Sequence, residues 1–274
     1  MLLYNGHIIP EEALRLPLSN RAFQYNDGFF ETMIVLNGRI RFWNDHVARM
    51  QEAVEALRLS LFDQLSPDEL QQQLLHLAAL KNASGYGRLK LKVWRSGAGL
   101  YTPQTDAADW LATAQPTQAA ADEPLTIGIC QQTQTLLSPF SHFKGPNALL
   151  YVMAGHEKQA GDYKDMLLLS FQGDVAELIS STIFWLQGDV LFTPALTTGC
   201  VNGILRRNVL RVAPANGFRV EEVSTGPAAL YRADAVFAAN VTGIRSIKAI
   251  NEKEVAGTDH LFLQLLQQAL FAKV

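Results

Sequence analysis

The chain has 274 residues, of which 48% are hydrophobic and 18% charged, enough for one large or two medium globular domains. Its net charge of −3 and pI near 6.1 provide no overall positive field, which argues against nucleic acid or an anionic membrane as the main partner and favours a small molecule. Cys130 and Cys200 form no paired motif. This indicates neither a disulfide framework nor a thiolate metal site and is typical of a reducing cytoplasm.

Residues 1–10 show neither a basic stretch nor a cleavage-like site, and no run of about 18 apolar residues occurs. The sequence therefore predicts a cytoplasmic protein without a membrane-spanning helix.

The first part of the chain predicts hairpins and helices. Asn-Gly pairs supply the positive φ angles of tight turns, so strands are predicted at 2–4 and 7–9 and again at 29–36 and 39–43. We expect Asp45 to cap a helix that ends at Leu57. A second helix is predicted from Ser66 to about Lys81, and a half-buried strand at 88–94.

Between Tyr101 and Pro124 the composition shifts to Ala, Thr, Gln, Asp and Pro, which is poor core material and indicates an interdomain segment. We predict a small N-terminal α/β domain at 1–112, a linker at 113–124 and a larger C-terminal domain at 125–274. In the second domain, strands are expected at 125–131, 166–170, 183–186 and 190–193, and helices at 147–161, 203–213 and 261–271. The predicted fold class is α+β.

Several common site motifs are missing. Gly97-Ala-Gly99 is too short for a dinucleotide or phosphate-loop fingerprint, and no Gly-x-Ser-x-Gly element occurs. The histidines at 46, 142, 156 and 260 lack metal-ligand spacing, so no catalytic metal is predicted.

Lys144 stands beside Gly145 and Pro146 at a predicted strand-to-helix transition. Partial desolvation there would lower the pKa of its amine and make it nucleophilic. The alternative is an ordinary solvated loop lysine.

Glu177 lies in an apolar, strand-like context, where an unpaired carboxylate is costly. We expect a cationic partner for it, either a structural Arg or Lys or a cofactor. Gly203 precedes a predicted helix, whose first amides are a natural phosphate site or simply an ordinary helix entry.

Six segments, taken in order, resemble the class IV aminotransferases, the fold-type IV enzymes that use pyridoxal 5'-phosphate (PLP). They are 19–32, 46–49, Lys144-Gly-Pro-Asn147, 175–184, Val201-Asn-Gly-Ile-Leu-Arg206 and 234–243. The resemblance implies a two-domain α+β fold like that of D-amino-acid aminotransferase, with PLP in the cleft and a homodimer that completes the site.

The resemblance also implies roles for individual residues. The lysine matching Lys144 binds PLP as a Schiff base and then moves protons. The glutamate matching Glu177 keeps the ring nitrogen protonated. The arginine matching Arg49, with Gly203 and the amides of Ile204 and Leu205, holds the phosphate. Asn240 and Thr242 are both candidate cofactor ligands, because the register of that motif is open by one residue.

Some positions depart from the family pattern. Thr182 stands where Asn is usual, Leu205 where Thr is frequent, and Leu149 at about the place of the tyrosine of branched-chain enzymes. The last departure argues against a branched-chain aminotransferase.

Within the family, the motifs are most similar to aminodeoxychorismate lyase, which splits 4-amino-4-deoxychorismate into 4-aminobenzoate and pyruvate for folate synthesis. Its two carboxylates require cationic donors, and Arg95 is the candidate in the first domain, with a surface arginine as the alternative reading. Glu31 is a second predicted substrate residue. A glutamate at this position is more similar to the aminotransferases than to the lyases. Leu100 and Tyr101 stand where lyases often carry another arginine.

Two other functions remain open at this point. The first is a transaminase that acts on D-amino acids or branched-chain L-amino acids through the same Lys144. The second is a PLP-free scaffold, which has no physical need for Lys144, Glu177 and Arg49 together.

Overall fold

The computed structural model describes residues 1–63, 65–119, 121, 123–146 and 148–271. Contacts between residues divide the chain into two compact units. Unit 1 comprises Met1–Ala119 and Phe143–Pro146, and unit 2 comprises Ala120–His142 and Asn147–Val274. The chain therefore leaves unit 2 for the four residues 143–146 and then returns to it.

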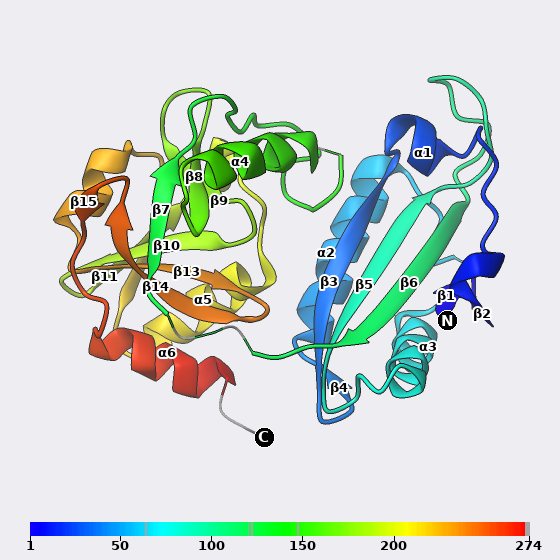
Figure 1. Ribbon diagram of the computed structural model, residues 1–274, viewed down its shortest axis with the longest axis horizontal. Coiled ribbons are helices and arrows are strands. Elements are labelled where there is room, and N and C mark those ends of the chain that lie inside the picture. The colour runs from blue at the N-terminus through cyan, green and yellow to red at the C-terminus, as the bar shows by residue number, and fades with distance from the viewer. Residues whose placement is uncertain (64, 120, 122, 147, 272–274) are drawn as a thin grey trace. The chain divides into compact units, whose positions relative to one another are not determined.

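Unit 1 is built on an antiparallel six-stranded sheet in the order β2-β1-β6-β5-β3-β4 (Figure 1). Long antiparallel pairing joins β3 to β5 and β5 to β6. The strands are β1 (Leu2–Tyr4), β2 (His7–Ile9), β3 (Gly28–Leu36), β4 (Arg39–Ile40), β5 (Tyr86–Arg95) and β6 (Ala108–Pro116).

The helices of unit 1 are α1 (Arg21–Tyr25), α2 (Trp43–Leu57) and α3 (Pro67–Leu80), with a 3-10 turn at Glu11–Ala13. The apolar sides of α2 and α3 bury Met50, Leu70 and Leu74 against the sheet residues Met33 and Leu91 in one core. Because side chains alternate along a strand, the opposite sheet face carries the polar residues of β3, β5 and β6.

Unit 2 has a mixed nine-stranded sheet in the order β12-β11-β10-β13-β14-β7-β8-β9, with β15 paired to β14. Parallel pairing joins β7 to β8, β7 to β14 and β11 to β12. The strands are β7 (Leu125–Ile129), β8 (Asp165–Leu169), β9 (Val175–Leu178), β10 (Thr182–Gln187), β11 (Val190–Pro194), β12 (Arg219–Val223), β13 (Ala235–Asn240), β14 (Gly243–Ile250) and β15 (Lys253–Glu254).

The helices of unit 2 are α4 (Ala148–Ala160), α5 (Ile204–Ala215) and α6 (Leu261–Phe271), with 3-10 turns at Leu196–Thr198 and Pro227–Arg232. α4 packs on β8 through Ala154, Met166 and Leu168. Phe262 of α6 contacts Phe218 and Phe237, with ring centroids 4.1 and 6.2 Å apart.

The α+β, fold-type IV class predicted from the sequence is confirmed. Within it, the hairpin of β1 and β2 and the Ser66-capped helix form as predicted. The second hairpin also forms, but its second strand, predicted at 39–43, ends at Ile40 because α2 begins at Trp43. Asp45 is not a cap, because α2 begins two residues earlier at Trp43 with Phe42 as its N-cap. The predicted start of the helix at Asn147 lies outside the described residues.

The two units differ from the predicted domains in two places. β6 continues to Pro116 in full register with β5, so residues 113–116 of the predicted linker are strand, and unit 1 ends at Ala119. The segment Phe143–Pro146, predicted in the second domain, belongs to unit 1 because it is bonded along β3.

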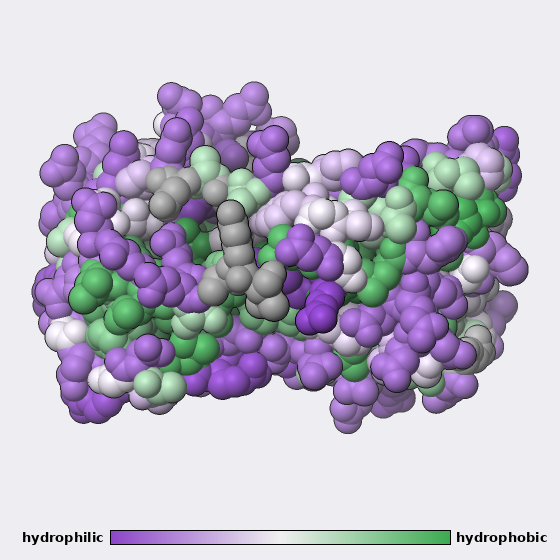
Figure 2. Space-filling model, turned by 90° about the horizontal axis from the view of Figure 1, so that it is seen from below, coloured by the Kyte–Doolittle hydropathy of each residue, from purple (hydrophilic) through white to green (hydrophobic). Residues whose placement is uncertain are grey.

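Among the described residues, no helix is long and apolar enough to cross a membrane. Hydrophilic residues cover most of the face seen in Figure 2, and hydrophobic residues gather there in separate patches. The part of the chain that the structure describes also holds no group of three His, Cys, Asp or Glu side chains suited to a metal ion.

Candidate active site

Arg49 is held in the core of unit 1 by a two-pronged contact with Glu31. Its Nε donates to Oε1 and its Nη2 to Oε2, at 2.8 and 2.7 Å. Nδ1 of His46, one turn earlier on α2, lies 2.7 Å from the same Oε2. All three side chains are buried. Such paired charge-assisted bonds fix a guanidinium in one plane.

The charge state of this cluster follows from its surroundings. Burial raises the pKa of Glu31, but the charges and hydrogen bonds of Arg49 and His46 outweigh it and bring the pKa to about 2. Burial lowers the pKa of His46 despite the opposing charge of Glu31. Glu31 is therefore an ionised partner of Arg49.

The backbone around Lys144 lies along the start of β3. The amide of Phe30 donates to the Lys144 carbonyl at 2.9 Å, and Nδ2 of Asn26 donates to the Gly145 carbonyl at 2.8 Å. Gly145 has φ of +152°, and a Cβ there would lie 2.7 Å from the Gly28 carbonyl oxygen. Glycine is therefore required for this close approach, which holds Lys144 beside β3.

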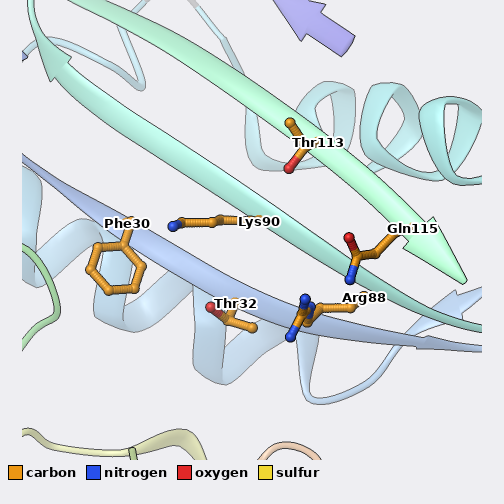
Figure 3. Close-up of a pocket in the computed structure, with 6 residues that line it drawn as sticks. All are labelled: Phe30, Thr32, Arg88, Lys90, Thr113 and Gln115. Atoms are coloured by element: carbon orange, nitrogen blue, oxygen red, sulfur yellow. The ribbon is translucent and has the colours of Figure 1, made fainter. Parts of the chain in front are cut away.

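A pocket of about 290 Å³ opens on the polar face of the same sheet (Figure 3). It is lined by alternate residues of three strands: Phe30 and Thr32 of β3, Arg88 and Lys90 of β5, and Thr113 and Gln115 of β6. The Lys90 ammonium lies 5.2 Å from the centre of the Phe30 ring. Two cations, Arg88 and Lys90, therefore line this pocket. Phe30, which also lines it, donates a backbone hydrogen bond to the Lys144 carbonyl.

Lys92 continues this row of cations on β5. Its Nζ donates to Asn26 Oδ1 at 3.5 Å, so Asn26 links β5 to the Lys144 segment. Burial, followed by the charge of Lys90, lowers the pKa of Lys92.

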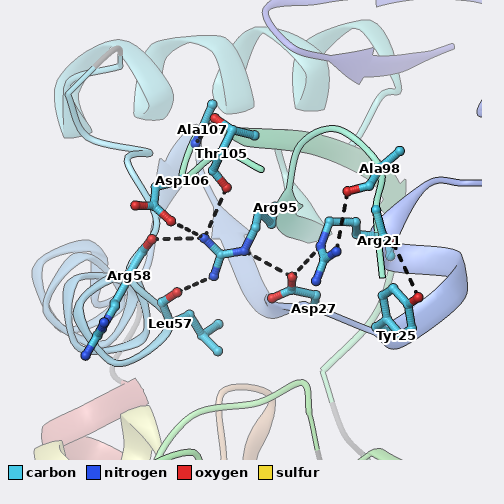
Figure 4. A network of polar contacts seen from close by, with 12 residues as sticks. Arg21, Tyr25, Asp27, Leu57, Arg58, Arg95, Ala98, Thr105, Asp106 and Ala107 are labelled. Atoms are coloured by element: carbon cyan, nitrogen blue, oxygen red, sulfur yellow. Dashed lines mark hydrogen bonds and ion pairs between the residues drawn. The ribbon is translucent and has the colours of Figure 1, made fainter. Parts of the chain in front are cut away.

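Arg95 occupies a closed network elsewhere in unit 1 (Figure 4). Its Nε donates to Asp27 at 3.1 Å and its Nη1 to Asp106 at 2.7 Å, while Nη1 and Nη2 also donate to the carbonyls of Arg58 and Leu57. The last two carbonyls lie at the C-terminal end of α2. Arg95 is 6% exposed, and these bonds give it a structural role at the end of α2.

In unit 2, Glu177 of β9 is 5% exposed and accepts hydrogen bonds on both oxygens. The Tyr151 hydroxyl donates to Oε1 at 2.7 Å, and the Val201 amide donates to Oε2 at 3.2 Å. These two donors are neutral. Tyr151 was not predicted, because residues 151 and 177 become neighbours only when α4 packs on the β8–β9 pair.

The N-terminus of α5 lies after Gly203, which caps the helix without a side-chain bond. A Cβ at Gly203 would lie 2.8 Å from Oγ1 of Thr182. The first amides, those of Ile204 and Leu205, therefore meet no capping side chain, and such helix ends attract phosphate.

Asn240 and Thr242 belong to one turn between β13 and β14. Oδ1 of Asn240 accepts from the Thr242 amide and hydroxyl at 2.9 and 2.6 Å, and its Nδ2 donates to Ser181 Oγ at 3.0 Å. The two candidates of the ambiguous motif are thus direct partners, and they lie next to Thr182.

A sequence profile of the family described as Amino-transferase class IV matches residues 28–250. The chain belongs to this family. It is 25% identical to the aminodeoxychorismate lyase of Vibrio harveyi over 87% of this chain and 89% of that protein. It is 28% identical to the D-alanine aminotransferase of Bacillus licheniformis over 88% and 84%.

Solved structures agree with this assignment. The 4-amino-4-deoxychorismate lyase of Pseudomonas aeruginosa is similar at a TM-score of 0.86 and 26% identity, over 99% of both chains. The T.th. branched-chain amino acid aminotransferase with pyridoxamine 5'-phosphate gives 0.87 at 21% identity, over 100% of this chain and 94% of that one. The class IV aminotransferases are PLP-dependent enzymes.

The residues of this chain fit PLP. An arginine plane fixed by Glu31 and an uncapped helix N-terminus suit a phosphate. A buried carboxylate held by neutral donors suits a protonated ring nitrogen.

Proposed function

We propose that this enzyme is a PLP-dependent 4-amino-4-deoxychorismate lyase, which forms 4-aminobenzoate and pyruvate on the route to folate. The observation that carries the proposal is the cationic pocket on β5, where Arg88 and Lys90 face the same space beside the strand that holds Lys144. A substrate with two carboxylates needs two such donors. The lyase relatives support the same reaction.

We assign the cofactor residues as follows. Arg49 and the amides of Ile204 and Leu205, with Gly203 giving close access, would bind the phosphate. Glu177 would accept a hydrogen bond from the ring nitrogen, and Lys144 would bind the aldehyde carbon. The Asn240–Thr242 turn supports the Ser181–Thr182 segment next to Gly203.

The chain's own groups then perform the following steps. Arg88 and Lys90 bind the substrate carboxylates and orient its ring. The freed amine of Lys144 takes the proton from the amine-bearing ring carbon. When bound, PLP withdraws the electron pair left at that carbon. The ring becomes aromatic as its bond to the enolpyruvyl oxygen breaks. The enolpyruvate that leaves takes the proton back from the Lys144 ammonium on its methylene carbon and becomes pyruvate, so no amino acceptor or oxidant is needed.

The alternative is a class IV aminotransferase acting on D-amino acids or branched-chain L-amino acids. The similarity to D-alanine aminotransferase favours it, and one cation of the pocket would suffice for a single α-carboxylate. A homodimer in the cytoplasm is part of either proposal.

The test incubates PLP-loaded protein with freshly generated aminodeoxychorismate and follows 4-aminobenzoate. We expect product from the wild type and none from Lys144→Ala. Arg88→Ala and Lys90→Ala should each raise KM about tenfold or more, whereas Arg219→Ala, 68% exposed on β12, should not. If no product forms but D-alanine or a branched-chain amino acid converts the cofactor to its amine form, the enzyme is a transaminase.

A further inference from the structure

We propose that Tyr151 is a positioning residue that acts on the cofactor through Glu177. Its hydroxyl keeps the carboxylate ionised and in one orientation, and so sets how tightly the protein binds a ligand with a protonated ring nitrogen. The inference rests on the proposed function, in which Glu177 receives that nitrogen.

Both ends of this contact are anchored to the same part of unit 2. The Tyr151 ring packs against the cluster of Cys130, Ala154, Met166 and Leu168. Leu168 of β8 is the direct antiparallel partner of Glu177 in β9. Because helix and strand share this cluster, the 2.7 Å distance between the Tyr151 hydroxyl and Oε1 is set by packing.

The tyrosine and the backbone divide the two carboxylate oxygens between them. Tyr151 takes Oε1 and the Val201 amide takes Oε2. An ionised carboxylate offers about four lone-pair sites, so it can accept a hydrogen bond from a ligand in addition to bonds from the protein. They also restrict rotation of a side chain that is 5% exposed.

The phenol acts only as a donor. Burial, and then the charge of Glu177, raise the pKa of Tyr151 well above 10. Tyr151 therefore keeps its proton at working pH. Without it, the buried Oε1 loses a hydrogen bond that favours the charged form, and the carboxyl group becomes easier to protonate. A protonated Glu177 cannot hold a protonated ring nitrogen.

The experiment compares two ligands on the apo-protein, PLP and its analogue with carbon in place of the ring nitrogen, through quenching of tryptophan fluorescence. Tyr151→Phe removes only the hydroxyl. We expect it to raise the Kd for PLP about tenfold, the usual effect of losing a hydrogen bond to a charged group, while the Kd for the analogue changes less than about twofold.

Tyr163→Phe is the matched control, since Tyr163 packs against the same cluster and no bond joins it to Glu177 in the described structure. It should leave both Kd values unchanged. The pH profile gives a second readout: in Tyr151→Phe, the loss of PLP affinity with acid should begin about one unit higher than in Tyr163→Phe.

Four results would overturn the inference. An equal loss for both ligands would show that Tyr151 only supports the fold, and no change for either would show that it has no part in binding. If Glu177→Gln weakens PLP selectively but Tyr151→Phe does not, the inference alone fails. If the wild type itself binds both ligands equally, the proposed role of Glu177 fails with it.

Discussion

Nε and Nη2 of Arg49 donate to the two oxygens of Glu31 at 2.8 and 2.7 Å, in a site where both side chains are almost fully buried. Burial removes both charges from water, so their mutual attraction helps to offset the cost of desolvation. This pairing ties α2 to β3 and makes the proposed phosphate arginine part of the core of unit 1.

Glu31→Gln is expected to destabilise the protein by about 3 to 5 kcal/mol, because the buried Arg49 loses the opposite charge of Glu31. Urea denaturation at pH 7 measures the loss. Glu254→Gln, exposed on β15, is the control and should change stability by less than about 0.5 kcal/mol. A similar small change in Glu31→Gln would contradict the prediction.

The same pair predicts a pH dependence of unfolding. Because the folded-state pKa of Glu31 is lowered from 4.5 to about 2, its stabilisation is complete above pH 4.5 and is lost as the pH falls toward 2. The full effect is on the order of 3 kcal/mol. Denaturation between pH 6 and pH 3 should show this slope in the wild type and a shallower one in Glu31→Gln. Parallel curves would refute it.

Arg95→Ala should destabilise the protein by about 3 kcal/mol, since it leaves the carbonyls of Leu57 and Arg58 and the carboxylate of Asp27 short of a donor. Asp106→Ala removes a side chain that is 62% exposed and breaks its contact with Arg95, which should cost less than about 1 kcal/mol. Thermal unfolding of the two variants provides the comparison. Equal losses of stability in the two variants would mean that the bonds from Arg95 to the Leu57 and Arg58 carbonyls do not stabilise the C-terminal end of α2.

Gly145→Ala should weaken PLP binding and reduce stability by more than about 1 kcal/mol, because a Cβ meets the backbone of Gly28 and Phe29 at a positive φ. Gly155→Ala, in α4 with no atom within 4 Å of the added Cβ, should instead stabilise by about 0.5 to 1 kcal/mol. Fluorescence titration measures the Kd for PLP, and denaturation measures the stability of each variant. An unaltered Kd in Gly145→Ala would argue against a fixed Lys144 segment.

The loss of stability in Gly203→Ala should be partly reversed by a second substitution, Thr182→Ala. The added Cβ would lie 2.8 Å from the buried Thr182 hydroxyl, so the double variant with Thr182→Ala should recover at least about 0.5 kcal/mol relative to the sum of the single variants. A double-mutant cycle in urea measures this coupling. Strict additivity would show that α5 shifts to relieve the contact.

The sequence by itself determined much of the local structure and the class of chemistry. Asn5-Gly6 and Asn37-Gly38 form their turns, and Ser66 forms its capping box with Glu69, because turns and caps depend on neighbouring residues. The order of motifs around Lys144 and Glu177 was sufficient to indicate the family and PLP.

Only the tertiary structure decided which polar groups face each other. Arg95 and Glu31, predicted at the substrate, are engaged by partners up to several tens of residues away, and Tyr151 reaches Glu177 across 26 positions. The cations of β5 line one pocket because three strands place their alternate residues on the same face of the sheet. These relationships depend on packing between distant segments, which no local pattern of residues encodes.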